Sequence, residues 1–560
     1  MKVIKVDKTA SKGIAIGKVF LVQKAEFTVN TASITKEDVG KEIERFETAV
    51  TKVEEDLIPL AETNPIFGAH LEMVKDITLY DSVISKIKEN KYNAELAFDT
   101  AAGEFIRMFE ALEDEYMRER AADMKDIRNR LLSVLQGIAV NPFDKINEPV
   151  ILVAGDLTPS DTAKMNLKLI QGFITQDGGV TSHVSIMAKG LGIPALVGVG
   201  DALKEIKDGD NLILDAGSGN IIVNPDPDTI KRYTALLLEY EKRRAELTKL
   251  GPLPAKTTDG KTVFLCANAG NIQDIKNALQ YHIDGIGLFR SEFLYMENTH
   301  FPTEEEQFLV YKEAAELCGK ELTIRTLDIG GDKNLSYYEF EKEDNPFLGW
   351  RAIRISLELK DMFKQQLRAI LRASAFGNIR IMFPMIISLE ELRTAKEILK
   401  ECQEELDNLN INWDHKIKVG MMIETPASVL LAEEFAKEAD FFSIGTNDLT
   451  QYILAVDRGN KKISGMYNSF HPSVIRSISR VIKAAHNNHI KVGMCGEFAS
   501  DEKAALLLLG LGLDEFSMSA SEIPDIKEII RNSSYENAIT LAKSACEKCT
   551  LKEVYEVLGI

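Results

Sequence analysis

The chain has 560 residues, well beyond the ~250–300 at which one hydrophobic core stops growing, so the sequence predicts two to four domains. Its formal net charge of −19 argues against nucleic-acid binding, because contacts with phosphate groups need a basic surface. The start, MKVIKVDKTASKGIAIGKVF, alternates apolar and polar residues, and no run of about 18 apolar residues occurs, which argues against a signal peptide and a membrane anchor. Six scattered cysteines favour a reducing compartment, so we expect a cytoplasmic protein.

Short apolar segments bounded by glycine, aspartate or proline predict β-strands near the start of the chain and again after residue 140. They are GIAIGKVFLV, PVILVAGDL, KLIQGFITQDG, PALVGVG and NLILDAG. Between them, apolar residues recur at three- and four-residue steps, which predicts a bundle of about four helices. The clearest run is Ile43, Phe46, Val50, Val53 and Leu57. We expect an α/β domain built from residues 1–30 and 140–225, with the helical bundle inserted at 31–139.

A polar, helix-favouring segment follows at residues 226–254. Asp228 is the expected N-cap, and Gly251-Pro252 ends the helical run. About 20 helical residues span ~30 Å. The segment therefore predicts a linker helix between two domains.

In residues 255–560, eight apolar segments end in small, polar or charged residues, with helix-like stretches between them. They are VFLCANAG, GIGLFRSE, LTIRTLDIGGDK, IRIMFPM, IKVGMMIET, FFSIGTND, IKVGMCGE and EFSMSASE. Eight βα units predict a TIM (β/α)8 barrel, in which the carboxyl ends of the strands converge on one face. A doubly wound sheet is the competing fold, although such sheets rarely need eight parallel strands with reactive groups at every end.

The ends of these segments and the adjacent loops carry side chains that suit a small polyanion, because guanidinium groups bind phosphate and carboxylate through paired hydrogen bonds. The basic side chains are Arg290, Arg325, Lys333, Arg351 and Arg458. The same strand ends and loops also carry Asp328, Asn447 and Glu497. Two carboxylates from different strands, Glu424 and Asp448, suit Mg²⁺, which takes one or two carboxylates together with waters and substrate oxygens. A salt bridge at the rim is the alternative for any single residue. As a set they fit phosphoenolpyruvate, among other phosphorylated acids.

Cys495 and His183 each allow two interpretations. Cys495, in VGMCGE, is either a buried small residue or a proton donor, whose thiol nearby negative charge would keep protonated. His183, in GGVTSHVSIMAKG, follows a glycine pair and two hydroxyl residues, Thr181 and Ser182, that can cap a helix. A phosphoryl group on its imidazole would lie near free N–H groups of the first turn. From the spacing alone, a surface or hydrogen-bonded histidine remains the alternative.

Over essentially the whole chain, the order of the motifs resembles the Enzyme I family of the bacterial sugar phosphotransferase system, the phosphoenolpyruvate–protein phosphotransferases. In the first half these motifs are ERAADMKDI, LTPSDTA, and GG-TSH-SIMA with IPA-VG. In the second half they are PTEEEQF, RTLDIGGDK, NPFLGWRAIR, MFPMI, GMMIETP, SIGTNDLTQY and GMCGE.

The resemblance implies a transferase that moves the phosphoryl group of phosphoenolpyruvate to His183 and then to a histidine of the carrier protein HPr, releasing pyruvate, in sugar transport. It implies that Thr162 hydrogen-bonds the ring of His183, that Cys495 protonates the enolate at C3, and that Glu424 and Asp448 hold Mg²⁺. It implies these phosphoenolpyruvate-binding residues: Arg290, Arg325, Arg351, Lys333, Asn447, Asp448 and Arg458. It also implies an α/β phosphohistidine domain that swivels on the linker, an HPr-binding bundle, and a homodimer formed through the barrel.

Two positions depart from the family, because Val180 and Lys189 stand where arginine is common. We expect a less stabilised phosphohistidine, or charge supplied from elsewhere. The dikinases are the alternative assignment, since they share the phosphohistidine and barrel domains. They add a large nucleotide-binding domain, whereas here a mostly helical segment without a glycine-rich nucleotide loop precedes the histidine region. Apolar residues from Phe67 to Leu79 are expected to serve mostly the bundle core and partly HPr docking.

Overall fold

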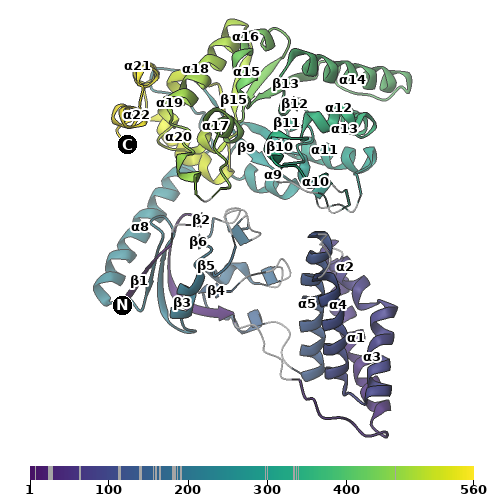
Figure 1. The fold of residues 1–560 in the computed structure, drawn as a ribbon. Coiled ribbons are helices and arrows are strands. Elements are labelled where there is room, and N and C mark those ends of the chain that lie inside the picture. Colours follow the sequence, from purple (N-terminus) through teal and green to yellow (C-terminus); the bar gives the residue numbers. More distant parts are fainter. Residues whose placement is uncertain are drawn as a thin grey trace. The chain divides into compact units, whose positions relative to one another are not determined.

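The structure is a computed structural model of the chain. The residues that it describes are 1–6, 8–22, 29–61, 65–110, 115–137, 142–155, 157, 161–162, 165–178, 184–185, 187–188, 192–296, 298, 300–331, 335, 337–338, 340–460 and 462–560. They form two compact units, Met1–Tyr240 and Glu241–Ile560. Figure 1 labels most of the helices and strands of both units.

A mixed sheet organises the first unit, and its eight strands among the described residues run in the order β1-β8-β7-β3-β4-β5-β6-β2. Strands β3 to β6 are parallel, and the other neighbours are antiparallel. The strands are β1 Lys2–Lys5, β2 Thr9–Ser11, β3 Ile14–Val22, β4 Val150–Ala154, β5 Ile170–Thr175, β6 Ala195–Leu196, β7 Asn211–Asp215 and β8 Asn220–Val223. The five segments predicted as strands contain β3 to β7. Strands β1, β2 and β8 have four residues or fewer, too few for a clear alternation.

Both faces of the sheet are covered, and β4 shows why its sequence is continuously apolar. Ile151 and Val153 lie in one hydrophobic core, whereas Leu152 and Ala154 lie in the core on the opposite face. A strand buried on both sides loses the alternation of a half-exposed strand. Burying a side chain such as that of Leu152 contributes about 1.5–3 kcal/mol. The central strands therefore give a rigid support for the segments that follow their carboxyl ends.

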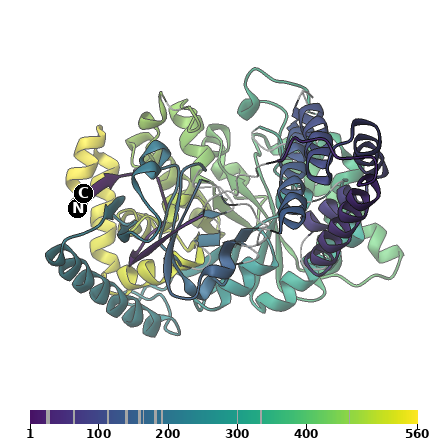
Figure 2. The same cartoon turned by 90° about the horizontal axis from the view of Figure 1, so that it is seen from below.

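A helical bundle lies in the chain between β3 and β4. Five helices of the bundle fall among the described residues: α1 Val39–Ala61, α2 Pro65–Val74, α3 Ile77–Asn90, α4 Ala94–Glu110 and α5 Glu115–Gln136. They stay together in the perpendicular views of Figure 1 and Figure 2. The sequence predicts about four helices because HLEMVKDITLY resembles one run. Asp76 divides it, since its carboxylate accepts the N–H groups of Thr78 and Leu79 and begins α3.

The bundle core contains the predicted apolar face of α1. Phe46, Val53 and Leu57 are fully buried, and Ile43 and Val50 pack against them with partial burial. The hydrophobic residues recur every three or four positions because 3.6 residues make one helical turn.

Helix α8 (Pro227–Leu250) corresponds to the predicted linker helix. The predicted N-cap is wrong, because the carboxylate of Asp226, two residues before Asp228, accepts the N–H of Thr229 at 2.8 Å. Pro227 is then the first helical residue, where a fixed φ and a missing N–H are tolerated. The helix ends directly before Gly251-Pro252, as expected.

A closed barrel of eight parallel strands forms the second unit among the described residues, which confirms the predicted TIM barrel. The strands are β9 Phe264–Ala269, β10 Gly285–Arg290, β11 Glu321–Arg325, β12 Ile379–Phe383, β13 Lys418–Ile423, β14 Phe441–Ile444, β15 Lys491–Met494 and β16 Glu515–Met518. Each lies in or overlaps one of the eight apolar segments that the sequence singles out.

Helices connect the strands and follow the last one. They are α9 Ile272–Leu279, α10 Glu292–Met296, α11 Glu304–Cys318, α12 Ile353–Glu358, α13 Lys360–Ser374, α14 Leu389–Asn408, α15 Pro426–Leu430, α16 Ala432–Phe435, α17 Thr446–Leu454, α18 Pro472–Asn487, α19 Ala505–Leu511, α20 Ile523–Arg531, α21 Tyr535–Glu547 and α22 Leu551–Leu558. The motif PTEEEQF starts α11 through a capping box, in which Thr303 and Glu306 each satisfy the other's backbone N–H.

The amino ends of the barrel strands hold a buried ion pair. Arg380 contacts Glu515 at 3.0 Å and Glu321 at 2.9 Å, and its guanidinium donates to the hydroxyl of Thr323 at 2.7 Å. In TIM barrels this end supports stability, whereas the active site lies at the opposite end. The pair is therefore a useful structural control for the rim.

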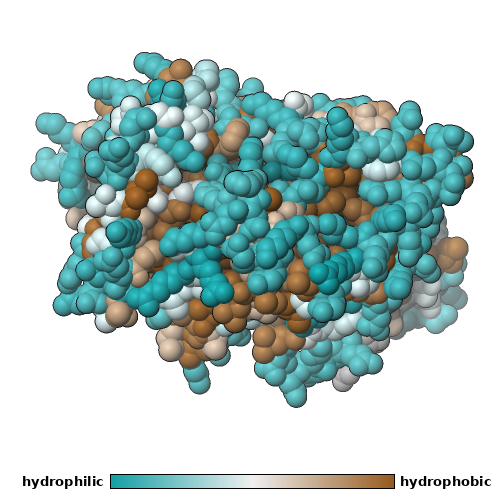
Figure 3. All heavy atoms as spheres, turned by 90° about the horizontal axis from the view of Figure 1, so that it is seen from above, coloured by the Kyte–Doolittle hydropathy of each residue, from teal (hydrophilic) through white to brown (hydrophobic). Residues whose placement is uncertain are grey.

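Hydrophilic residues cover most of the face shown in Figure 3, with smaller hydrophobic patches between them. All six cysteines are free thiols. Within the described part of the chain, no helix combines the length and apolar character needed to cross a membrane.

Candidate functional site

The predicted rim residues lie at the carboxyl ends of the barrel strands or just beyond them. Arg290 and Arg325 end β10 and β11, Glu424 directly follows β13, and Cys495 directly follows β15. The remaining members lie in the loops and helices that follow the strands: Arg351 before α12, Asn447 and Asp448 in the first turn of α17, and Arg458 after α17. Lys333 lies outside the described residues.

Glycines allow the backbone to bring these side chains close together. Gly330 and Gly331, in DIGGDK, have φ angles of 88° and 71°, which glycine adopts without strain. A Cβ atom at Gly330 would lie 2.6 Å from the carbonyl oxygen of Trp350, so only glycine lets the segment before Arg351 approach. Similarly, a Cβ atom at Gly445 would lie 2.7 Å from Oε2 of Glu424.

Acidic and basic side chains alternate across the rim. Arg325 places Nη2 2.6 Å from Oε1 of Glu292 and Nη1 3.0 Å from Oδ2 of Asp328. The other oxygen of Asp328, Oδ1, lies 3.0 Å from Nη2 of Arg351. Arg351 in turn places Nη1 3.5 Å from Oδ1 of Asp448. The two guanidinium groups, 5% and 2% exposed, are thus held by carboxylates from three segments of the chain.

Both buried guanidinium groups stay charged. Burial by itself would lower the pKa of Arg325, but Glu292 and Asp328 raise it above the ordinary range. The pKa of Arg351 is likewise raised by Asp328 and Asp448 against the effect of burial.

The phenol of Tyr452 adds a further contact at the rim. It accepts a hydrogen bond from Nη1 of Arg351 at 3.2 Å and donates to the carbonyl oxygen of Phe347. Its pKa is raised to about 12, chiefly by burial, so the phenol remains protonated and can bridge the two groups.

Among the rim residues that the structure describes, buried carboxylates outnumber buried arginines. Glu292, Asp328, Glu424 and Asp448 are all buried, against the two arginines just described. Burial, together with the negative charges of Asp448 and Asp328, raises the pKa of Glu424 from 4.5 to about 7 against the opposing effect of Arg325 and Arg351. An excess of negative charge is therefore left at Glu424, where a cation would relieve it.

Glu424 and Asp448 fit a divalent cation that brings its own waters. Oε1 of Glu424 accepts the N–H of Met385 at 2.6 Å, which fixes the carboxylate. Among the described residues no group of three or more His, Cys, Asp or Glu side chains is arranged to hold a metal ion. Two carboxylates form an incomplete cage, which suits Mg²⁺ because that ion usually keeps several waters and binds substrate oxygens.

Polar residues with partial exposure line the outer part of the rim. Arg290 and Arg458 are half-buried, and Arg458 places Nη2 3.9 Å from Oδ1 of Asp448. The amide oxygen of Asn447 accepts the backbone N–H of Glu497 at 3.0 Å, which fixes the orientation of the amide. These side chains can reach a ligand from the solvent side of the buried arginines.

Cys495 packs in a buried apolar cluster with Leu288, Met382 and Met422. Burial raises the pKa of its thiol to about 11. The sequence predicts a protonated thiol because of nearby negative charge. The direction agrees, but burial is the larger cause, and the charge of Glu424 only adds to it. At neutral pH the group holds a proton that it can donate.

The predicted nucleophile lies in a segment that the structure describes only in part. His183, Val180 and Lys189 fall outside the described residues, as do Thr181 and Ser182. Just before them, Gly178 has a φ of 101°, so the first glycine of the pair does adopt an angle that favours glycine.

The described residues around that segment are buried in the first unit. Val184 and Ala188 belong to the core on one face of the sheet, four residues apart as on one side of a helix. Thr162 is 6% exposed in a short helical turn after β4. Val184 and Ala188 are therefore fixed in the core of the first unit.

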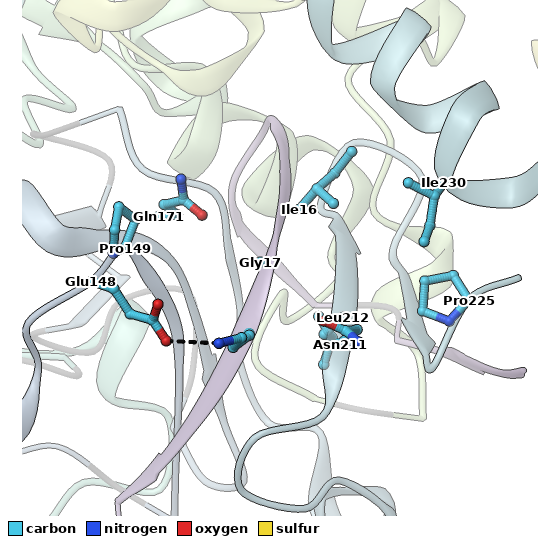
Figure 4. Close-up of a pocket in the computed structure, with 10 residues that line it drawn as sticks. Ile16, Gly17, Glu148, Pro149, Gln171, Asn211, Leu212, Pro225 and Ile230 are labelled. Atoms are coloured by element: carbon cyan, nitrogen blue, oxygen red, sulfur yellow. Dashed lines mark hydrogen bonds and ion pairs between the residues drawn. The ribbon is translucent and has the colours of Figure 1, made fainter. Parts of the chain in front are cut away.

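A separate cavity of about 330 Å³ in the first unit contains none of the predicted site residues (Figure 4). Ile16, Leu212 and Ile230 contribute apolar walls, and Gln171 contributes an amide. Its charged groups neutralise each other, because Lys18 donates to Glu148 at 3.0 Å. The cavity offers no unpaired charge for a phosphorylated acid.

Comparison with known proteins covers nearly the whole chain. Residues 244–535 match the family described as PEP-utilising enzyme, PEP-binding domain. Residues 8–120 match PEP-utilising enzyme, N-terminal, and residues 146–219 match PEP-utilising enzyme, mobile domain. A phosphoenolpyruvate-protein phosphotransferase of Haemophilus influenzae is 46% identical over 559 residues, or 98% of this chain and 97% of that protein. The chain belongs to the phosphoenolpyruvate-protein phosphotransferase family.

Other relatives agree with this family. The phosphoenolpyruvate-protein phosphotransferase of Buchnera aphidicola subsp. Acyrthosiphon pisum is 47% identical and covers 98% of each chain. The relative of the same name in Geobacillus stearothermophilus is 45% identical and covers 97% of this chain and 96% of its own. A solved structure, the NMR solution structure of Enzyme I (nEIt), is 37% identical, covers 43% of this chain and all of its own, and has a TM-score of 0.37. The resemblance to Enzyme I in the motifs is confirmed by the full-length relatives.

Two members of this phosphotransferase rim are not singled out by residue type or spacing. Glu292 lies two residues after Arg290 in LFRSE, and Tyr452 ends the motif TNDLTQY. Asp328 is recognisable as a polar residue after a strand, but its two-sided contact with Arg325 and Arg351 depends on a long loop that the sequence pattern does not place. For Glu292, the one sequence signal was its position just after the end of a predicted strand.

Proposed function

We propose that this enzyme transfers the phosphoryl group of phosphoenolpyruvate to His183 and then to the histidine of the carrier protein HPr, releasing pyruvate. This is the first step of sugar uptake by the phosphotransferase system. The observation that carries the proposal is the rim, where two buried, charged arginines stand beside an excess of buried carboxylates. Full-length relatives named phosphoenolpyruvate-protein phosphotransferase support the same reaction.

Phosphoenolpyruvate carries a phosphate and a carboxylate, and the rim offers separate cations for them. Arg325 and Arg351 supply rigid guanidinium groups, and Arg290 and Arg458 supply groups with access to solvent. We assign Asn447 and Lys333 to the same substrate site on the family pattern. Guanidinium groups held in place before binding need little reorganisation as charge spreads over the transferring group.

Glu424 and Asp448 would hold Mg²⁺, in keeping with the raised pKa of Glu424 and the surplus of carboxylates. When bound, this ion neutralises negative charge on the oxygens of the phosphoryl group. The chain's own residues orient the substrate around that position.

The chemical step breaks the bond between phosphorus and the enol oxygen and forms a bond between phosphorus and Nε2 of His183. Thr162 hydrogen-bonds the ring and helps to fix the tautomer that leaves Nε2 free for attack. The thiol of Cys495 gives its proton to C3 of the departing enolate, which yields pyruvate, and the thiolate regains a proton from water. The raised pKa of Cys495 keeps that proton available at neutral pH.

We propose that each domain predicted from the sequence has its own role in the transfer. Residues 1–30 and 140–225 carry the phosphohistidine, residues 31–139 dock HPr, and residues 226–254 link this part to the barrel at 255–560. The phosphohistidine part swivels between the barrel and HPr, and two chains pair through their barrels. The reaction takes place in the cytoplasm.

Few of the apolar residues between Phe67 and Leu79 are exposed enough to contact HPr. Phe67, Met73, Val74 and Leu79 are buried in the bundle core, as expected for most of this stretch. Ile77, in the first turn of α3, is 75% exposed. We propose Ile77 as an apolar contact for HPr, because it is the most exposed apolar side chain among the described residues of this stretch.

Isotope exchange tests this function without HPr. Labelled pyruvate should enter phosphoenolpyruvate when the enzyme, Mg²⁺ and both metabolites are present and no nucleotide is added. The exchange should disappear in His183→Ala, because the phosphohistidine is the only store for the phosphoryl group. Exchange that requires ATP, or that persists in His183→Ala, would contradict this function.

A further inference from the structure

We propose that Asp328 is a positioning residue that sets the orientation of Arg325 and Arg351 and keeps Arg351 from moving closer to Asp448, one of the two carboxylates that would hold the metal. The inference rests on the phosphoenolpyruvate site proposed above. Asp328 itself need not touch substrate, since its two oxygens are already engaged by the two guanidinium groups.

The geometry of Asp328 is that of a bridge. Its Oδ2 lies 3.0 Å from Nη1 of Arg325, and its Oδ1 lies 3.0 Å from Nη2 of Arg351. All three side chains are buried, so water cannot replace the carboxylate at these contacts. Because the two arginines come from different segments, this single carboxylate fixes their guanidinium groups relative to each other.

No other carboxylate of the rim contacts both arginines among the described residues. Glu292 contacts Arg325 at 2.6 Å, and Asp448 contacts Arg351 at 3.5 Å. Removal of either would loosen one guanidinium group, whereas removal of Asp328 would loosen both.

The second consequence concerns the metal. Arg351 already lies 3.5 Å from Oδ1 of Asp448, a longer contact than its 3.0 Å pair with Asp328. Without Asp328, the carboxylate of the described residues that still contacts Arg351 is Asp448, and electrostatic attraction would draw the pair together. An arginine bound to Asp448 competes with Mg²⁺ for that carboxylate. Asp328 therefore protects the metal site as well as aligning the arginines.

The test compares Asp328→Asn with a matched control at the other end of the barrel. Asparagine has nearly the same shape but only one accepting oxygen, and its amide N–H₂ would face a guanidinium donor. Glu515→Gln removes a buried carboxylate that also pairs with a buried arginine, Arg380, at 3.0 Å. Both variants lose a buried ion pair, so a purely structural role predicts similar behaviour for the two.

Three quantities are measured on the full-length chain by phosphoenolpyruvate–pyruvate exchange and thermal unfolding: kcat/KM, the Mg²⁺ concentration for half-maximal rate, and Tm. For Asp328→Asn we expect kcat/KM to fall about 100-fold, the cost of misplaced binding groups, and the Mg²⁺ requirement to rise several-fold. For Glu515→Gln we expect a lower Tm with both kinetic quantities close to wild type. Equal kinetic losses in the two variants, or an unchanged Mg²⁺ requirement in Asp328→Asn, would overturn the inference.

Asp328→Glu keeps the test decisive if Asp328→Asn does not fold. It retains the charge but moves the carboxylate by one methylene, so a positioning role predicts impaired exchange with Tm near that of wild type. Wild-type kinetics in Asp328→Glu would refute the role. Arg351→Lys separates this inference from the function on which it rests: if that variant exchanges normally, the substrate site itself is misplaced, whereas an inactive Arg351→Lys with a fully active Asp328→Glu defeats only the inference.

Discussion

Replacing Glu424 by glutamine should stabilise the metal-free protein while abolishing its response to metal. In the metal-free rim, burial and the charges of Asp448 and Asp328 raise the pKa of Glu424 from 4.5 to about 7. This corresponds to about 3 kcal/mol of destabilisation when the folded carboxyl is ionised, at ~1.4 kcal/mol for each tenfold change. Glutamine keeps an oxygen that can accept the N–H of Met385 and carries no charge to bury.

The sign of the effect follows from the raised pKa. Below about pH 4.5 the carboxyl is protonated in the folded and unfolded states, so Glu424 costs nothing. As the pH rises towards 7, the unfolded carboxyl ionises first, and the folded state of the wild type loses stability relative to Glu424→Gln. Above pH 7 the difference stays constant, at up to about 3 kcal/mol in favour of the variant.

Tryptophan fluorescence provides a selective assay in the full-length chain, because its two tryptophans, Trp350 and Trp413, both lie in the barrel unit. Urea unfolding in EDTA at pH 5 and pH 8 should show a larger advantage of Glu424→Gln at pH 8. Added Mg²⁺ should then stabilise the wild type, by about 2.7 kcal/mol at 100 times its Kd, and leave the variant unchanged. Glu515→Gln is the control: it should be less stable than wild type and still respond to Mg²⁺. If Glu424→Gln is less stable than wild type at pH 8 in EDTA, Glu424 is not a destabilising buried charge, and if the variant responds fully to Mg²⁺, Glu424 is not a metal ligand.

Three further predictions concern proton donation, docking and the phosphohistidine. Cys495→Ser should slow phosphoenolpyruvate–pyruvate exchange at least about 100-fold, because the proton donor is lost. Since the pKa of the thiol is raised to about 11, ionisation of Cys495 should not reduce the wild-type exchange rate between pH 7 and 9. A wild-type rate that falls in this pH range because the thiol ionises would contradict this role. Ile77→Glu should raise the KM for HPr about tenfold, as loss of a contact at a binding surface does, with exchange and Tm unchanged; a normal KM would exclude Ile77 from the interface. Val180→Arg should lengthen the half-life of the phosphohistidine in denaturant-free buffer, and an unchanged half-life would show that the missing charge is supplied elsewhere.

Most of the fold could be predicted because its strongest signals are local. Each barrel strand is a short apolar run that ends in polar residues, and eight such runs with helices between them leave few alternatives to a barrel. The start of α8 was misplaced by two residues because Asp226 and Asp228 are equally good caps, and only the backbone geometry selects Asp226. The division of α2 from α3 was hidden for a related reason, since Asp76 acts as a cap inside an apparently continuous helical pattern.

The sequence was enough to predict which residues lie at the rim, but not which of their side chains contact one another. Residue type and position after a strand were enough to choose Arg325, Glu424 and Asp448. They could not show that Asp328 bridges two arginines, because that contact brings Arg351 back from a long loop through glycines with positive φ. The pKa of Cys495 was predicted in direction only, since burial, its main cause, depends on the packed barrel interior.

Phosphoryl transfer from phosphoenolpyruvate should pass through His183 and should need no nucleotide. Incubation of the full-length enzyme with phosphoenolpyruvate labelled in its phosphate and with Mg²⁺, without nucleotide, tests it most directly. We expect one phosphate per chain that is labile in acid and stable in alkali, is located on His183 by peptide mapping, and is removed by pyruvate. Label that survives in His183→Ala, that resists acid, or that appears only with ATP would contradict it.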